Sequence, residues 1–292
     1  YNEKDSFYKY SSPKFTEQEE LSENINTDIC IVGGGLTGIS AALNLADQGY
    51  DVCILEANKI GSGASGRNGG QLGIGMRKDQ LYLENKFGFE KAEFFWNVGL
   101  DAVKNVTNLI SKHNIDCALK PGILHAGNTK KDYKYFLEEI EHMKSKYNYD
   151  NYEYFDENAI KDEVNTDQYY SGLLTKDSFH LNPLKLTYGL ANQCLGKGIK
   201  IFENSPIDKI EEKGNDILLF SKNVVIKSKK VIIACNGYLD NLLGSVSNFF
   251  MPINNYIIAT EPLGEKLARQ IIKRNCGVVD SRFMIDYYRF SE

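Results

Sequence analysis

The feature that most constrains this fold is a glycine-rich turn between an apolar run and a helical pattern near the start of the chain. Residues 28–32, DICIV, are apolar and rich in β-branched side chains, which predicts a short buried strand. The turn 33–38 follows at once, and residues 39–50 have helical spacing. A second apolar run, DVCILE, ends on Glu56. The order strand, helix, strand predicts a parallel βαβ unit.

Within this unit Gly33, Gly35 and Gly38 form a G-x-G-x-x-G motif, and Glu56 follows the first glycine by 23 positions. The first glycine permits a tight turn, the second admits a pyrophosphate to the backbone, and the third allows close helix–strand packing. The helix N-terminus offers N–H groups to the anion. Glu56 can accept hydrogen bonds from ribose hydroxyls and would repel a 2′-phosphate. The motif predicts a site for FAD or NAD rather than NADP, and a purely structural turn is the alternative.

A second glycine-rich stretch, GSGASGRNGGQLG, occupies residues 61–73. Its glycines allow close backbone approach and unusual dihedral angles, and Ser62 and Ser65 can bond a phosphate or a ring edge. A flexible surface loop is the alternative interpretation. Flexibility alone does not explain why Arg67 and Asn68 occur in a stretch made mostly of small residues. We therefore expect the stretch to run along the part of the dinucleotide beyond the pyrophosphate.

Composition removes several other function classes. The chain has 34 Lys and Arg against 39 Asp and Glu, a net charge of -5, so a nucleic-acid partner is not expected. The longest apolar runs, such as VIIAC at 231–235, are far shorter than the roughly 20 residues that cross a bilayer. The N-terminus is polar and has no signal-type segment, so we expect a cytoplasmic protein without a transmembrane segment. Six scattered cysteines and four histidines have no metal-ligand or disulfide-framework spacing, so no metal is predicted.

Residues 51–73 resemble the FAD-dependent oxidoreductases of the D-amino acid oxidase superfamily, most closely the gamma-glutamylputrescine oxidase branch. Further segments follow in that family's order: IDCALKPGILHAG (115–127), FHLNPLKLTYGLA (179–191), VIIACNGYLDNL (231–242), IIATEPL (257–263) and DYYRFSE (286–292). The resemblance spans nearly all of the chain and decides the cofactor, FAD rather than NAD.

The resemblance implies an α/β protein of two domains. A Rossmann-like FAD-binding domain is expected at 1–82 and 179–245, and a discontinuous α+β substrate domain with a mixed sheet at 83–178 and 246–292. Residues 90–113 and 130–147 have helical spacing and fall in the substrate domain. Full-length relatives continue past the YYR strand into a glycine-containing turn and a helix that faces the flavin. The chain is therefore expected to be truncated at its C-terminus, and a second chain could supply the missing segment.

The resemblance also implies which residues lie at the cofactor. Residues 64–65 and 67–70 would lie at the flavin, the backbone of Ile207 against the adenine, and the 234–237 turn beside the pyrophosphate. Taken alone, VIIACNG is more typical of an ordinary buried strand that ends in a turn, with Cys235 packed rather than catalytic. The expected FAD-binding residues are Gly33, Gly35, Leu36, Thr37, Gly38, Glu56, Ala57, Gly63, Ala64, Ser65, Arg67, Asn68, Gly69, Gly70, Ile207, Ala234, Cys235, Asn236 and Gly237.

The chemistry implied by the resemblance is oxidation of a C–N bond in a small amine or amino acid. A hydride passes to flavin N5, the imine hydrolyses, and oxygen or another acceptor takes the electrons. Arg289 and Tyr288 are the expected catalytic residues: Arg289 would anchor a substrate anion or the flavin edge, with Tyr287 or Tyr288 lining the pocket. A solvent-facing strand arginine is the alternative. Other candidate functions are a D-amino acid dehydrogenase, a glycine or sarcosine oxidase, and a non-catalytic FAD-binding remnant.

Overall fold

The computed structural model describes residues 6–239, 242–249 and 251–291. The chain divides into two compact units, of which the first comprises Tyr1–Asn68 with Pro183–Ile258 and the second Gly69–Asn182 with Ala259–Glu292. Among the described residues, no helix combines the length and apolar character that a membrane crossing requires. All six cysteines are free thiols.

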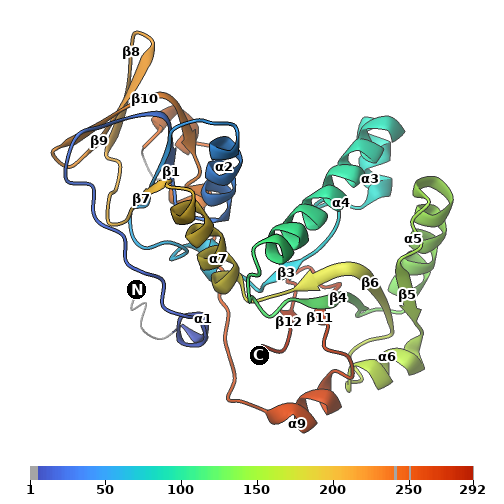
Figure 1. Ribbon diagram of the computed structural model, residues 1–292. Coiled ribbons are helices and arrows are strands. Elements are labelled where there is room, and N and C mark those ends of the chain that lie inside the picture. Colours follow the sequence, from blue (N-terminus) through green and yellow to red (C-terminus); the bar gives the residue numbers. More distant parts are fainter. Residues whose placement is uncertain (1–5, 240–241, 250, 292) are drawn as a thin grey trace. The chain divides into compact units, whose positions relative to one another are not determined.

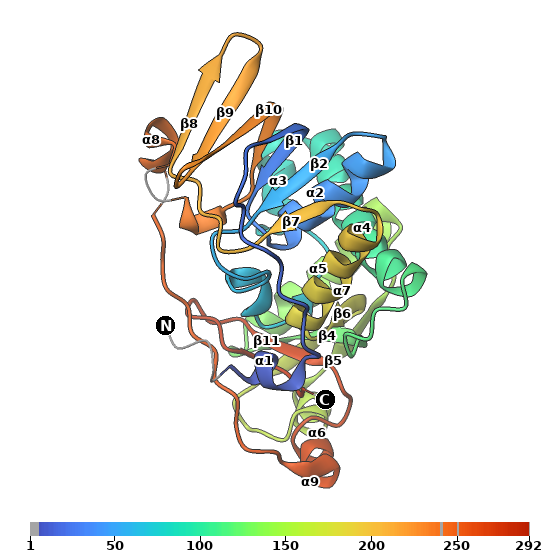
Figure 2. The same ribbon diagram turned by 60° about the vertical axis from the view of Figure 1, so that its left-hand side comes forward.

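The first unit is built on a six-stranded sheet with the order β7-β2-β1-β10-β9-β8 (Figures 1 and 2). Its strands are β1 (Ile25–Val32), β2 (Val52–Leu55), β7 (Lys200–Phe202), β8 (Lys209–Lys213), β9 (Asp216–Ser221) and β10 (Val224–Ile233). The strands β7, β2, β1 and β10 are parallel neighbours, whereas β8 and β9 add an antiparallel meander to β10. The last four residues of β1 and all of β2 are buried, as expected for a parallel sheet covered on both faces.

Helix α2 (Leu36–Asp47) connects β1 to β2, which confirms the predicted βαβ unit and the Rossmann-like fold. Helix α7 (Pro183–Gly196) packs beside it, since the thiol of Cys194 contacts the carbonyl oxygen of Ile39. The shorter helices of this unit are α1 (Phe7–Ser11), α8 (Gly244–Ser247) and the 3₁₀ turns η2 (Ala64–Gly66) and η3 (Asn236–Tyr238).

A buried carboxylate ties the N-terminal segment to this sheet. Glu203, only 1% exposed, follows β7 and accepts hydrogen bonds from the backbone N–H of Gln18 at 3.0 Å and of Ile60 at 2.7 Å. Lys59 lies 3.3 Å from the same carboxylate and supplies the opposite charge. A buried carboxylate is stable only when it is paired and hydrogen-bonded in this way. Glu203 therefore fixes both the N-terminal segment and the connection that follows Glu56.

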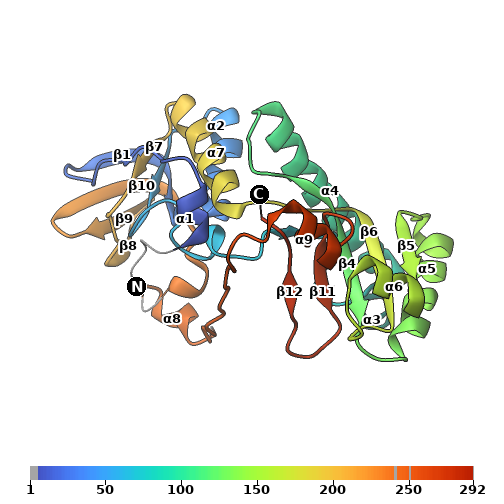
Figure 3. The ribbon, with the colours of Figure 1, turned by 90° about the horizontal axis from the view of Figure 1, so that it is seen from below.

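The second unit contains a mixed sheet with the order β12-β11-β4-β6-β3, in which β5 also pairs with β6 (Figures 1 and 3). Its strands are β3 (Gln71–Leu72), β4 (Lys120–Gly127), β5 (Tyr152–Phe155), β6 (Ser171–His180), β11 (Gly277–Asp280) and β12 (Tyr287–Tyr288). Among the described strands of this sheet, only β4 and β11 pair in parallel. The helices are α3 (Gln80–Phe87), α4 (Phe89–Lys112), α5 (Asp132–Tyr147), α6 (Glu157–Glu163) and α9 (Gly264–Ile271).

The observed unit boundaries differ from those expected from the sequence, 82/83, 178/179 and 245/246. The reason is strand β3, whose Gln71 and Leu72 pair with His180 and Phe179 of β6. This pairing places residues 69–82 and 179–182 in the second unit. Residues 246–258 fall in the first unit, whereas the sequence analysis assigned them to the substrate domain.

Glu139, on α5, is expected to make the stability of the second unit depend on pH. Its carboxylate lies 3.4 Å from the hydroxyl of Tyr152, and burial, with the nearby charge of Asp79, raises its pKa to about 7. Because the unfolded pKa is lower, the unfolded state binds fewer protons and stability falls as pH rises toward 7. We expect Glu139→Gln to stabilise the protein by about 1–3 kcal/mol at pH 8 and not at pH 4.

Urea unfolding measured from pH 4 to pH 8 checks this expectation. The matched control is Glu138→Gln, because Glu138 is exposed and its ion pair with Lys134 is long, at 3.9 Å. The control should follow the parent protein at every pH, since such surface pairs contribute little. Parallel stability curves for Glu139→Gln and the parent would contradict the assignment.

Candidate functional site

The glycine turn after β1 is closely packed. Gly33 has φ +115°, a conformation that favours glycine, and a Cβ there would lie 2.6 Å from the carbonyl oxygen of Ala234. A Cβ at Gly38 would overlap the carbonyl oxygen of Gly33. The N–H of Ala234 in turn donates to the carbonyl of Val32 at 2.8 Å. Two expected site segments, 33–38 and 234–237, are therefore in direct contact within the first unit.

The N-terminus of α2 meets the second glycine-rich stretch. The N-cap residue Gly35 has no side chain to cap this helix, and the N–H of Leu36 donates instead to the hydroxyl of Ser65 at 2.9 Å. A Cβ at Gly35 would lie 2.7 Å from the same hydroxyl. Thr37 and Gly38 belong to the first turn of the helix, where the backbone dipole favours an anion. The arrangement is suited to binding a phosphate group.

Glu56 is held beside this turn at the end of β2. One of its carboxylate oxygens accepts the N–H of Gly34 at 2.7 Å, and the other accepts the N–H of Asn58 at 2.9 Å. Its backbone is fixed as well, because its N–H donates to Phe202 and its carbonyl accepts from Ser205. Carboxylate oxygens have further lone pairs, so Glu56 can also accept hydrogen bonds from ribose hydroxyls. The adjacent Ala57 is exposed.

Residues 61–68 fold back on themselves. The side-chain amide of Asn68 donates to the carbonyls of Ala64 at 3.0 Å and Ser65 at 3.1 Å. A Cβ at Gly66 would overlap the carbonyl oxygen of Gly61, and one at Gly63 would lie 3.3 Å from the ring of Tyr238. The smallness of these residues is thus required by packing within the chain. Arg67, which follows the 3₁₀ turn, is exposed.

Two of the other expected cofactor residues of this unit pack against one apolar cluster. Cys235 and Ile207 pack against a cluster that contains Val32 and Leu55. Burial raises the pKa of Cys235, so its thiol stays protonated at neutral pH. Asn236 has φ +50° and begins a 3₁₀ turn that includes Gly237.

In the second unit, Gly69 and Gly70 meet the residues around β12. A Cβ at Gly69 would overlap the ring of Tyr287, and one at Gly70, which has φ +68°, would overlap the carbonyl oxygen of Leu181. Arg289 donates from Nε to the carbonyl of Gly69 at 2.8 Å and from Nη1 to the carbonyl of Phe290 at 3.0 Å. The structure therefore brings together Gly69, Gly70, Tyr287 and Arg289.

Tyr288 does not join that group. Successive side chains of a strand point to opposite faces, and Tyr288 packs against the core cluster that contains Leu124 and Val278. Its hydroxyl lies 3.0 Å from that of Tyr169, and burial raises its pKa. Of the two expected pocket tyrosines, Tyr287 lies on the same side of the strand as Arg289. Tyr288, the one we expected to be catalytic, faces the core.

One exposed titratable residue on the face of Tyr287 was not selected from the sequence. His125 of β4 pairs in register with Val279 of β11, which pairs with Tyr287 of β12. Its neighbours Leu124 and Ala126 are buried, whereas His125 is exposed. The alternation in GILHAG signals which side of the strand His125 occupies, but only the pairing with β11 shows that Tyr287 shares this side.

Comparison with known proteins gives the class of protein that this fold and these sites define. The sequence profile of the family described as "DAO: FAD dependent oxidoreductase" matches residues 28–292, and the chain belongs to this family. It is 36% identical over 287 residues to the gamma-glutamylputrescine oxidoreductase of Escherichia coli (strain K12). The aligned region covers 98% of this chain and 67% of that protein. The resemblance inferred from the sequence is thereby confirmed.

Solved structures share the fold. The L-proline dehydrogenase from P. horikoshii has a TM-score of 0.64 at 19% identity, covering 92% of this chain and 68% of its own. An L-amino acid deaminase from Proteus myxofaciens has a TM-score of 0.60 at 22% identity, covering 76% of this chain and 48% of its own. The chain thus spans about two thirds of the curated relative and about half of the deaminase.

Proposed function

We propose that this chain binds FAD and oxidises the C–N bond of an amine or amino acid that carries an anionic group. The observation that supports this most is the G-x-G-x-x-G turn of the first unit. It is hydrogen-bonded to Ser65 at the helix N-terminus and to Glu56 at the strand end. In a chain of the FAD-dependent oxidoreductase family, this arrangement offers a pyrophosphate site and a ribose acceptor side by side.

The residues present fit FAD. The first turn of α2 supplies N–H groups to a pyrophosphate beside Ser65, and Glu56 supplies acceptors to a ribose. Arg67 adds an exposed positive charge in the stretch expected to lie at the flavin. When bound, FAD supplies the hydride-acceptor chemistry, and the chain supplies binding, orientation and charge.

Arg289 is the proposed substrate anchor. Its guanidinium is oriented by the carbonyls of Gly69 and Phe290, and the planar geometry of a guanidinium suits recognition of a carboxylate. Tyr287 and His125 share one face of the second sheet and are the proposed lining of the substrate site. The relative named gamma-glutamylputrescine oxidoreductase indicates the substrate class, an amine that bears a carboxylate at its other end.

The test begins with the visible absorption spectrum of the purified chain and identification of the cofactor released by heat. We expect one FAD per chain, followed by amine-dependent flavin bleaching under anaerobic conditions. Hydrogen peroxide release would identify an oxidase, and reduction of an added dye without peroxide a dehydrogenase. A colourless protein that also fails to take up added FAD would overturn the proposal. A yellow protein that no amine or amino acid bleaches would favour a non-catalytic FAD-binding protein.

A further inference from the structure

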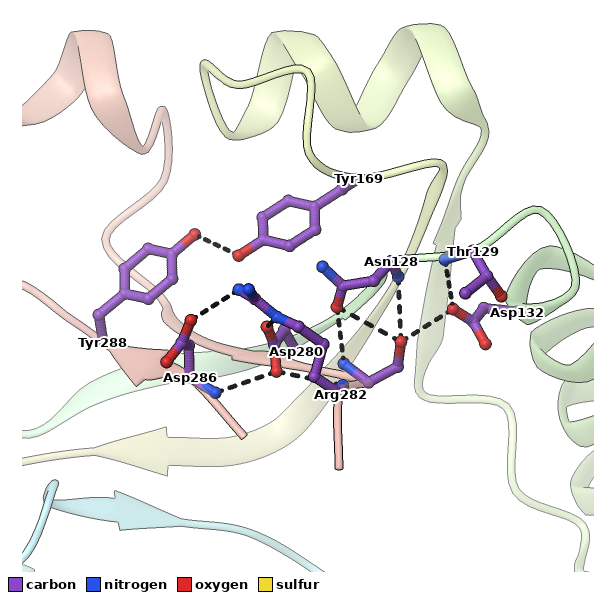
Figure 4. A network of polar contacts seen from close by, with 9 residues as sticks. Asn128, Thr129, Asp132, Tyr169, Asp280, Arg282, Asp286 and Tyr288 are labelled. Carbon is purple, nitrogen blue, oxygen red and sulfur yellow. Dashed lines mark hydrogen bonds and ion pairs between the residues drawn. The ribbon is translucent and has the colours of Figure 1, made fainter. Parts of the chain in front are cut away.

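The turn between β11 and β12 is organised around one buried carboxylate (Figure 4). The side chain of Asp280 has no exposed surface and accepts the N–H of Asp286 at 3.0 Å and the N–H of Arg282 at 3.3 Å. It also pairs with Nε of Arg282. The N–H of Asp280 donates to the carbonyl of Asp286 at 3.0 Å, which closes the turn from both sides.

A second group of contacts ties the same turn to the connection between β4 and α5. The N–H of Ser281 donates to the carbonyl of Ala126 at 3.0 Å. The hydroxyl of Ser281 accepts the N–H of Asn128 at 3.0 Å and donates to the carboxylate of Asp132 at 2.8 Å. Figure 4 shows Asn128 and Asp132 of this connection close to the Asp280 group. The turn is therefore attached to the centre of the sheet at one end and to β12 at the other.

Strand β12 depends on such an attachment. It has only two residues and pairs only with β11 in the described chain, through Tyr287 with Val279 and Tyr288 with Val278. A pairing this short is marginally stable by itself. The fixed turn lets Tyr288 reach Tyr169 on the core side. On the other side it holds Arg289 at the carbonyl of Gly69.

We propose that Asp280 is a positioning residue: by locking the turn it fixes the register of β12, so that Arg289 is held on Gly69 and presents its guanidinium to the anionic group of the substrate. The last clause rests on the proposed function. A buried acceptor stabilises several donors most strongly when it is charged. A donor that loses this acceptor and stays buried without a partner costs free energy. Arg282 and the turn N–H groups are the donors that depend on Asp280.

The test compares Asp280→Asn with the matched control Asp286→Asn by amide hydrogen exchange. Both aspartates pair with Arg282 in the same turn, but the side chain of Asp286 is 64% exposed. In Asp280→Asn we expect exchange in peptides covering 283–291 to rise at least about tenfold, while peptides covering 120–127 are unchanged. Asp286→Asn should stay within about twofold of the parent.

Two exchange results would overturn the inference. Unchanged exchange at 283–291 in Asp280→Asn would show that the carboxylate does not hold β12. An equal rise at 283–291 and 120–127 would show that Asp280 supports the whole unit rather than this strand.

Substrate discrimination then separates the inference from the proposed function. The ratio of kcat/KM for an amine with a carboxylate to that for the same amine without it should fall in both Arg289→Met and Asp280→Asn. If it falls only in Arg289→Met, the positioning role of Asp280 is overturned. If it falls in neither while exchange at 283–291 rises in Asp280→Asn, the strand-fixing role is supported and the proposed anchor role of Arg289 fails.

Discussion

Gly38→Ala is expected to produce a protein that no longer retains FAD. The added Cβ would overlap the carbonyl oxygen of Gly33 and lie 3.1 Å from the side chain of Ile31. A backbone oxygen cannot rotate away as a flexible side chain can, so the turn itself must move. That movement would displace the N-terminus of α2, where we place the pyrophosphate. We expect the Kd for FAD to rise at least about 100-fold, which corresponds to about 2.7 kcal/mol and is within the range for overpacking.

The measurement is a titration of the purified protein with FAD, followed by flavin fluorescence. Gly196→Ala is the matched control, because a Cβ at this other helical glycine meets no atom within 4 Å. It should bind FAD like the parent. Thermal unfolding of both variants without cofactor separates lost binding from lost folding. Retention of FAD by Gly38→Ala at the parent affinity would show that the pyrophosphate does not use this turn.

The sequence predicted the βαβ unit well because its determinants are local. The apolar run 28–32, the glycines, the helical spacing and the run that ends on Glu56 are contiguous, and each favours one structure. Helix α4, observed at Phe89–Lys112, followed in the same way from the apolar spacing of residues 90–113. A local pattern that recurs over several turns leaves few alternatives.

The functions of the loop glycines could not be predicted in the same way. The sequence analysis explained the glycines of residues 61–73 by approach to a cofactor. In the structure, Gly66 approaches Gly61, and Gly70 approaches Leu181, which is more than 100 positions away. The contact of Gly70 depends on the pairing of β3 with β6, for which the two-residue strand β3 gives no periodic signal. A glycine in the sequence indicates only that there is little room for a side chain at that position. The structure is needed to identify the atoms that occupy the space.

The orientation of the two adjacent tyrosines was undetermined for a related reason. Tyr287 and Tyr288 must face opposite sides of a strand, but the sequence does not say which side is the core. The pairing of Tyr288 with Val278 places Tyr288 against the buried cluster and Tyr287 with Gly69. Asp280 was also not selected, because a single aspartate two positions before an arginine has no pattern that reveals a buried network.

Arg289→Met should lower kcat/KM for a carboxylate-bearing amine at least about 30-fold, because truncating one partner of a buried charge pair typically costs 2–5 kcal/mol. Methionine keeps much of the side-chain volume and removes the donors. We expect most of the loss in KM, since an anchor binds substrate and transition state alike. Arg289→Lys should recover only part of it, because an ammonium lacks the planar, bidentate geometry of the guanidinium.

The control for this experiment is Arg77→Met, which removes an exposed arginine from the same unit. It should leave both constants unchanged for both classes of amine. Parent, control and Arg289→Met should carry the same amount of FAD, because the turn that we assign to the pyrophosphate lies in the first unit. The anchor assignment fails if Arg289→Met lowers kcat/KM equally for amines with and without a carboxylate. Such a result would instead indicate that Arg289 acts on the cofactor, the other role that the sequence left open.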